Sequence, residues 1–330
     1  MMTSSLLKQL LWPAAVVLAA ALPWFAADFW VSTVATRTLI IGTTALSLTF
    51  LTSTTGMVSF AQAGIASAAG YAIALLTANT SGVGMVIPVM AALPLALGAG
   101  ILAGLIVGAL SLRSSGIYLL MITLAISMSW FFFVSQNVTV FNGFDGVNGV
   151  RPPVIAGIDL AQRLPFYLLC LAAAVLCIGL CAYLEHTPLG SALHGLRNAP
   201  RRMEALGHNT TALRLVAWGF AGFLAAVGGV LNVWYTRQVS PGSTDVHAAV
   251  GLLIVAVIGG IRRPSDAFLG ALFFVLLENF AQEIINRNRF NLVIGLAFIA
   301  VVMFLADGLT GLPARVRQLL QRRNEVTTPT

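Results

Sequence analysis

The chain has 330 residues, of which 58% are hydrophobic and only 9% are charged, and its mean hydropathy is +0.91. Too little polar surface remains to solvate a globular body of this size, so the composition excludes a soluble domain and indicates a polytopic membrane protein in a lipid bilayer. The formal net charge of +7 does not indicate a nucleic-acid partner, because the basic residues lie in short gaps between apolar runs.

A bilayer core requires roughly 20 helical residues, and the chain supplies about ten such segments, with a range of eight to ten. We therefore predict an all-α transmembrane helix bundle that forms a single domain over residues 1–312, followed by a basic tail over 313–330. Segments 57–78 and 246–260 are short or interrupted by Gly and polar residues, which predicts half-helices or re-entrant pieces buried against their neighbours. The predicted segments are 11–27, 38–55, 57–78, 85–110, 116–136, 164–184, 213–234, 246–260, 267–285 and 290–306.

The distribution of basic residues predicts the orientation. With a cytoplasmic N-terminus, twelve of the 18 Lys and Arg residues fall in cytoplasmic gaps, which favours both termini inside. The polar insert 185–212 then lies in the cytoplasm, whereas a turn-rich Gly/Pro loop at 137–163 and the segment 235–246 lie outside. Segment 11–27 also resembles a cleavable signal peptide, whose removal would leave the orientation of the remaining spans unchanged.

The insert 185–212 is the one long, strongly polar stretch away from the termini. A helical face within it predicts a short amphipathic helix. The alternative is a membrane-surface helix whose arginines bind anionic lipid headgroups. The apolar face consists of Ala192, Leu193, Leu196, Ala199 and Met203.

Polar side chains inside apolar runs are candidates for a solute pathway. Ser59, Gln62 and Ser67 permit a broken helix along a cavity, with ordinary interhelical hydrogen bonding as the competing interpretation. Glu278 is an acidic residue well inside a predicted span, and burying it costs on the order of 3 kcal/mol. We expect it to face other helices or a wet cavity, and a structural hydrogen bond is the alternative.

Two patterns bear on helix packing. Gly100, Gly104 and Gly108 repeat every four residues and predict close approach of another helix. Trp218 and Trp234 lie near the two ends of one span and predict interface anchors, with core packing as the alternative.

The reactive residues give no sign of catalysis. Cys170, Cys177 and Cys181 share one span and are interpreted as small apolar fillers. The histidines lack carboxylate or Cys partners at ligand spacing, so no metal site is expected. No GxxxxGK[ST], HExxH or GxSxG motif occurs, and we expect neither a cofactor nor enzymatic activity in this chain.

Several stretches resemble one family, the permease subunits of branched-chain amino acid ABC importers, and specifically its LivM-like branch. The resemblance covers most of residues 38–312. It rests on the order of TGMVSFAQAGIASAAGYAIALL, RSSGIYLLMITLA, NGFDGVNGV, TPLGSALHGLRNAPRRMEALGHNTTALRLVAWGFAGFLAAVGGVL, SPGSTDVHAAVGLLIVAVIGGIRRPSDAFLGALF and GLAFIAVVMFLADGLTGL.

The resemblance implies a permease of the bacterial inner membrane that works with several partners. These are cytoplasmic ABC ATPase subunits that hydrolyse ATP, a periplasmic solute-binding protein that docks on the outer loops, and a homologous permease subunit. A heterodimer is expected and a homodimer is the alternative. The insert becomes the element coupled to the ATPase, through Arg197, Arg201, Arg202, Glu204, Ala205 and Gly207.

The chain departs from the family pattern at two places. Ala61 and Gln62 stand where Gly-His is common, and Ile261 to Pro264 stand where Gly-Ser is common after paired glycines. The first departure leaves urea, short amides and small organic acids as alternatives to branched-chain amino acids. An ATPase-independent secondary transporter or channel is the contrasting class of function, and a membrane scaffold without a pathway is a third.

Overall fold

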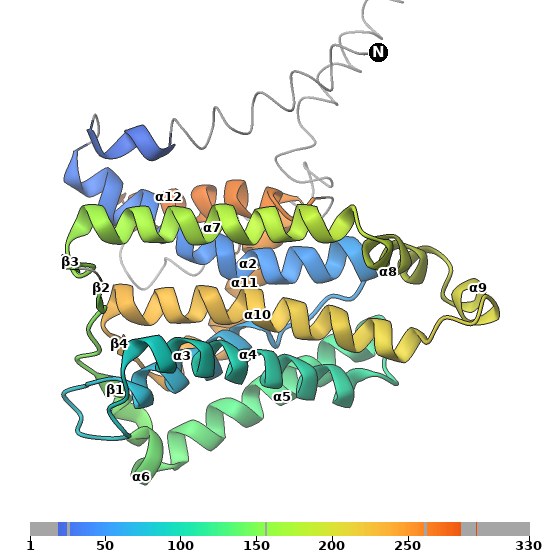
Figure 1. Cartoon of the computed structure of the whole chain (residues 1–330), viewed down its shortest axis with the longest axis horizontal. Coiled ribbons are helices and arrows are strands. Elements are labelled where there is room, and N and C mark those ends of the chain that lie inside the picture. The colour runs from blue at the N-terminus through green and yellow to red at the C-terminus, as the bar shows by residue number, and fades with distance from the viewer. Residues whose placement is uncertain (1–18, 25–26, 156, 261–262, 285–294, 296–330) are drawn as a thin grey trace, which may run out of the picture.

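Apolar runs of about 20 residues can satisfy their backbone groups in lipid only as helices, and the computed structural model of the chain is accordingly an all-α bundle (Figure 1). The prediction of the fold class is confirmed. The described residues are 19–24, 27–155, 157–260, 263–284 and 295. Most of the predicted segment 11–27, nearly all of the segment 290–306, and the basic tail lie outside them.

The described elements are mostly helices, with four strands of two residues each. They are π-helix η1 (Trp30–Ala35), α2 (Thr36–Thr55), α3 (Gln62–Leu76), α4 (Val89–Ser111), α5 (Ile117–Gln136), α6 (Val138–Phe141), η2 (Gly143–Asp145), β1 (Val147–Asn148), β2 (Val154–Ile155), β3 (Ile158–Asp159), α7 (Arg163–Glu185), α8 (Pro188–Asn198), α9 (Pro200–Ala205), α10 (Thr210–Thr236), β4 (Gln238–Val239), η3 (Pro241–Thr244), α11 (Val246–Gly259) and α12 (Asp266–Ile284).

The described helices differ in length as the sequence predicts. Five are long and apolar enough to cross a membrane, namely Trp30–Thr55, Val89–Ser111, Ile117–Gln136, Arg163–Glu185 and Thr210–Thr236. Helices α3 and α11 have only 15 and 14 residues, which confirms the short pieces expected at 57–78 and 246–260. Helix α3 begins inside the bundle, because its first residue, Gln62, accepts a hydrogen bond from Ser47 in the middle of α2.

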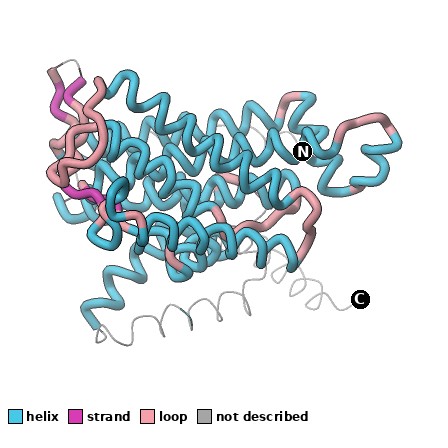
Figure 2. Tube along the Cα trace, turned by 90° about the horizontal axis from the view of Figure 1, so that it is seen from below, coloured by secondary structure: helices cyan, strands magenta, loops and turns pink. Residues whose placement is uncertain are grey.

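The bundle has two distinct ends (Figures 1 and 2). The strand end carries α6, the β2–β3 hairpin and the antiparallel pair β1–β4, in which Val147 lies opposite Val239. The insert end carries α8 and α9. The loops 137–163 and 235–246 therefore meet at one end of the bundle, and the insert 185–212 projects from the other.

Close packing of α4 on α10 explains the glycine repeat. A Cβ on Gly104 would lie 2.7 Å from the carbonyl oxygen of Trp218, and one on Gly222 would lie 2.7 Å from the carbonyl oxygen of Gly100. Gly108 lies against the side chain of Trp218 in the same way. The predicted close helix–helix approach is confirmed, since these backbones meet only without side chains between them.

The prediction that Trp218 and Trp234 anchor the chain at two membrane interfaces is wrong. Their exposed fractions are 1% and 5%, so both indoles are packed in the core. The physical reason is that α10 lies at the centre of the bundle, where α2, α3 and α4 all pack against it. The filler interpretation of the cysteines is confirmed, because all three are free and buried, at Cys170, Cys177 and Cys181.

The α4–α10 contact yields a matched test. Gly104→Ala places a methyl group against the backbone of α10, whereas Gly98→Ala on the same helix has nothing within 4 Å. We expect Gly104→Ala to cost about 1–3 kcal/mol, seen as a lower midpoint of thermal unfolding in detergent. Gly98→Ala should be neutral or slightly stabilising. Equal shifts in the two variants would contradict the described contact.

Candidate functional site

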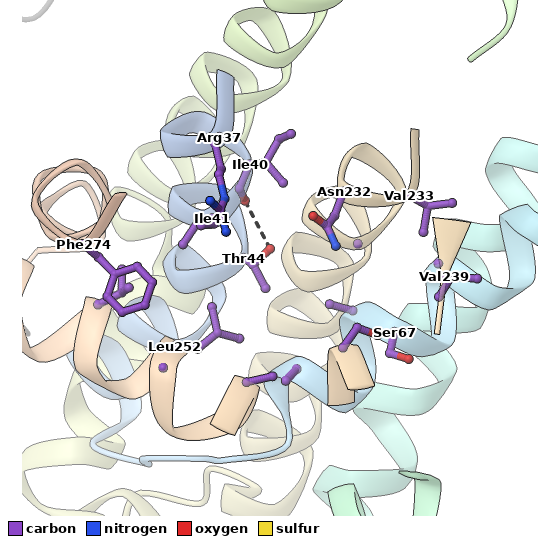
Figure 3. A pocket seen from close by; sticks show the side chains of 18 of the residues that line it. Arg37, Ile40, Ile41, Thr44, Ser67, Asn232, Val233, Val239, Leu252 and Phe274 are labelled. Carbon is purple, nitrogen blue, oxygen red and sulfur yellow. Dashed lines mark hydrogen bonds between the residues drawn. The ribbon is translucent and has the colours of Figure 1, made fainter. Parts of the chain in front are cut away.

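A cavity of about 290 Å³ lies between α2, α3, α10, α11 and α12 (Figure 3). It occupies the half of the bundle nearer the strand end, because α2 lines it with Arg37 to Thr44 and α3 with Ala63 to Gly70. Nearer the insert end the space is filled by a core cluster that includes Leu46, Phe50 and Trp218. The other lining residues are Gly229, Asn232, Val233, Val239, Ser243, Ala248, Gly251, Leu252, Val255, Phe274 and Glu278.

An ion pair forms part of the cavity wall. The Nη2 atom of Arg37 on α2 lies 2.7 Å from the Oε1 atom of Glu278 on α12, and the two side chains are 34% and 16% exposed. Glu278 thus faces both another helix and a cavity, as the sequence predicts. Its second oxygen, Oε2, is buried without a partner among the described residues.

Sequence reasoning missed Arg37 because it assigned this residue to a gap between spans. The helix instead begins at Trp30, and η1 continues into α2 without interruption. Residues 30–36 contain neither Gly nor Pro, which is the signal that a helix continues through them. A second missed residue is Asn232 of α10, whose carboxamide points into the cavity (Figure 3).

The structure separates the three polar residues predicted near the start of α3. Ser67 lines the cavity, and its Oγ accepts a hydrogen bond from the indole of Trp130 at 3.4 Å. Ser59 and Gln62 are each 1% exposed and do not line it. The Oγ of Ser59 accepts from the backbone N–H of Ala61, and the bond of Gln62 to α2 is interhelical.

The insert forms two helices, so the predicted amphipathic helix ends at Asn198 and does not include Ala199 or Met203 of the predicted apolar face. Ala199 has φ −152° and ψ 70°, outside the helical region. The cause is Pro200, whose ring disfavours helical backbone at the preceding residue and which starts α9 at a position that Pro tolerates.

Helix α8 uses its apolar face against its own bundle. Leu193 and Leu196 are 0% and 4% exposed and belong to the core cluster of the insert end. Arg197 extends over Gly56, and its Nη1 donates a hydrogen bond of 2.5 Å to the carbonyl oxygen of Ser53 at the end of α2. The apolar face of α8 is therefore already packed within the chain.

Helix α9 and the turn after it are exposed. Gly207 has φ +84° and follows the end of the helix in the left-handed conformation. The N–H of Gly207 donates to the carbonyl of Glu204, and the N–H of His208 donates to that of Met203, a Schellman cap. Leu206 is 75% exposed. This exposed tip, residues 200–208, also includes Arg201, Arg202, Glu204, Ala205 and Gly207 among its exposed residues.

A helical bundle with apolar membrane-spanning helices and a partly polar internal cavity defines the class of polytopic membrane transport proteins. Within that class, the chain belongs to the family of permease components of branched-chain amino acid transport systems, whose model matches residues 30–305. It is a LivM-like member of this family, as the resemblance in the sequence implies.

Individual relatives support this assignment. The high-affinity branched-chain amino acid transport system permease proteins LivM of Salmonella typhimurium and Escherichia coli are each 24% identical, over 93% of this chain and 76% of theirs. A probable LivM of Methanocaldococcus jannaschii is 26% identical over 53% of this chain and 52% of its own. No solved structure matches the chain significantly.

The cavity can be tested with two serine positions on one segment of the chain. We expect Ser67→Cys to react with a small charged methanethiosulfonate, because this position borders the cavity, and Ser59→Cys to stay unreactive. The native cysteines are buried and give little background. The extent of labelling is measured by mass spectrometry. Faster labelling at position 59 than at position 67 would contradict the described cavity.

Proposed function

We propose that the chain is the transmembrane subunit of an ATP-driven ABC importer that moves branched-chain or related amino acids by alternating access. The observation that carries the proposal is the two-ended layout. The solute cavity lies in one half of the bundle, and an exposed helical tip projects from the opposite end (Figure 1). The names of the relatives support the substrate class, since they are branched-chain amino acid permeases.

In this proposal α9 is the surface that docks on the cytoplasmic ATPase subunits. It offers an exposed apolar side chain, Leu206, beside Arg201 and Arg202, and the cap at Gly207 holds the tip in one conformation. The Oε1 atom of Glu204 accepts a hydrogen bond of 3.0 Å from Thr210, the first residue of α10. The tip is therefore braced against the next membrane helix, as a part that transmits force must be.

Helix α8 is the link between that tip and the cavity. Arg197 ties it to the last turns of α2, and α2 runs from there to the cavity, which it lines with Ile40, Ile41 and Thr44. A displacement of α9 is thus carried by α8 to a helix that borders the solute. Alternating access needs such a path from α9 to the cavity. Nucleotide on the ATPase and solute in the cavity must both shift one equilibrium, that between the outward-open and inward-open conformations.

The exposed surfaces of the bundle support the proposed positions of the solute-binding protein and the homologous permease subunit. The strand end, with the paired loops 137–163 and 235–246, is proposed to dock a periplasmic solute-binding protein. Helices α4 and α5 are only 22% buried over their most apolar stretches and face lipid or a homologous permease subunit. In this arrangement the insert and both termini lie in the cytoplasm of a bacterial cell. The exposed apolar side chains here include Leu95, Leu102, Ile106, Leu110, Ile117, Met121, Phe132 and Phe133.

The proposal is tested by reconstitution. Uptake of a branched-chain amino acid into proteoliposomes should require ATP, the ATPase subunits and the binding protein. Uptake driven by a proton or sodium gradient alone would replace the proposal with a secondary transporter. A complex that moves urea, short amides or small organic acids and no amino acid would keep the mechanism and change the cargo.

Docking through α9 gives a first prediction. Glu204→Ala combined with Gly207→Val removes the brace and places a β-branched residue at positive φ, which should disorder the tip. We expect normal membrane insertion, but transport lowered roughly tenfold or more and less ATPase retained on purification.

The control for the tip is Gly82→Val, since Gly82 also has positive φ (+67°) and open surroundings but lies in the loop between α3 and α4. This variant should retain the ATPase subunits like the unmodified chain. Normal transport in the Glu204/Gly207 double variant would refute the coupling role.

Transmission through α8 gives a second prediction. Arg197→Ala removes the bond to Ser53 without altering α9, so we expect the ATPase subunits to remain bound while solute moved per ATP hydrolysed falls severalfold. Arg202→Ala, at the exposed tip, should show the opposite pattern and weaken retention of the ATPase. The two quantities are measured together in proteoliposomes, and an Arg197 variant with unchanged transport per ATP contradicts the proposal.

A further inference from the structure

The Arg37–Glu278 pair is incompletely satisfied for an ion pair at membrane depth. A single contact of 2.7 Å joins Nη2 to Oε1, although a guanidinium and a carboxylate can form two parallel bonds. The second carboxylate oxygen of Glu278 has no partner among the described residues. Rotation of the terminal torsion exchanges the two oxygens at little cost, so either can face the cavity. Each partner retains hydrogen-bonding capacity for a third group.

The rest of the cavity is mostly apolar. Leu252 on α11 and Phe274 on α12 lie below Arg37 in the view of Figure 3, and Ile41 and Val255 also line the cavity. The cavity volume of about 290 Å³ corresponds to about ten water molecules at ~30 Å³ each, which is room for one small solute. The cavity therefore combines charges of both signs with a mostly apolar wall, in which Thr44, Ser67, Asn232 and Ser243 are the uncharged polar residues.

We infer that this pair is the headgroup site for a zwitterionic α-amino acid with an apolar side chain. Arg37 binds the α-carboxylate, Glu278 binds the α-ammonium, and the side chain lies against Leu252 and Phe274. The inference rests on the proposed function, because it assumes that this cavity is the solute site of the permease, and it assigns the chemistry that selects the solute there.

Charge balance favours this class of ligand. A zwitterion inserted between the partners replaces one ion pair with two and adds no net charge to the cavity. A carboxylate without an ammonium, or an amine without a carboxylate, adds one net charge and leaves one protein charge without its partner. An unpaired buried charge is costly, so the same pair that accepts a zwitterion discriminates against singly charged analogues of equal size.

Direct binding to the assembled transporter in nanodiscs tests this inference, with the external binding protein omitted. The ligands are leucine, its deaminated analogue isocaproate and its decarboxylated analogue isoamylamine. We expect the unmodified transporter to prefer leucine over each analogue by roughly tenfold or more, the usual effect of one charge-assisted bond. Glu278→Gln should abolish the preference over isocaproate, and Arg37→Gln the preference over isoamylamine.

Asp28→Asn is the matched control. Asp28 also pairs with an arginine at 2.7 Å, but this pair is exposed and lies outside the cavity, so both preferences should remain unchanged. If a single variant fails to assemble because one charge is left alone, the double variant Arg37→Gln with Glu278→Gln decides, and it should lose both preferences. The unmodified transporter is a test in itself, because equal affinity for leucine and its analogues overturns the inference.

A different result is expected if the Arg37–Glu278 pair only stabilises the contact between α2 and α12. Its loss lowers stability or transport but leaves both ligand preferences intact, and that outcome overturns the inference while the proposed function stands. The reverse failure is also distinguishable. If the complete system shows no ATP-dependent uptake although leucine binds preferentially through the pair, the proposed importer is wrong and the headgroup site remains.

Discussion

The proposed mechanism depends on the hydrogen bond from the guanidinium of Arg197 to the carbonyl oxygen of Ser53, because it fastens the insert to a helix that lines the cavity. Carbonyls near the end of a helix lack partners within it, and here a side chain from the insert supplies one. Without this bond and the burial of Leu193 and Leu196, the insert would be a surface appendage. With them, the insert is fastened to α2. Together with η1, α2 forms a span in which 78% of the most apolar stretch is buried.

The interior of the bundle divides into a packed half and a hollow half for identifiable reasons. Toward the insert end, large side chains such as Phe50 and Trp218 fill the space between helices. Toward the strand end, small residues of α3 and α10, including Ala66, Gly70 and Gly229, leave a cavity whose charged members must pair with each other.

Local patterns in the sequence predicted local structure well. Hydropathy located most of the described spans, and the four-residue glycine repeat predicted the close approach of another helix to α4. Each of these predictions depends on residue types and spacings within a single segment of the chain.

The errors came from features set by residues distant in the sequence. The tryptophans of α10 were assigned to interfaces because hydropathy does not reveal which helix lies at the centre. Arg37 was placed in a gap because the start of its helix at Trp30 was missed, and its ion pair was not predicted because Glu278 lies 241 residues away. The apolar face of α8 was correctly recognised as apolar, but its partner is the chain itself. The sequence also carried the family resemblance, which the comparisons confirm, and it indicated a cavity through Ser67 and Glu278 but missed Arg37 and Asn232 in its wall.

The most direct measurement is a cryo-electron microscopy map of the complete transporter in a lipid environment. From the proposed function we expect density for the ATPase subunits at α9 on the insert end, and density for the solute-binding protein over the paired loops at the strand end. ATPase density at the strand end, or an α9 that contacts only lipid headgroups, would contradict it.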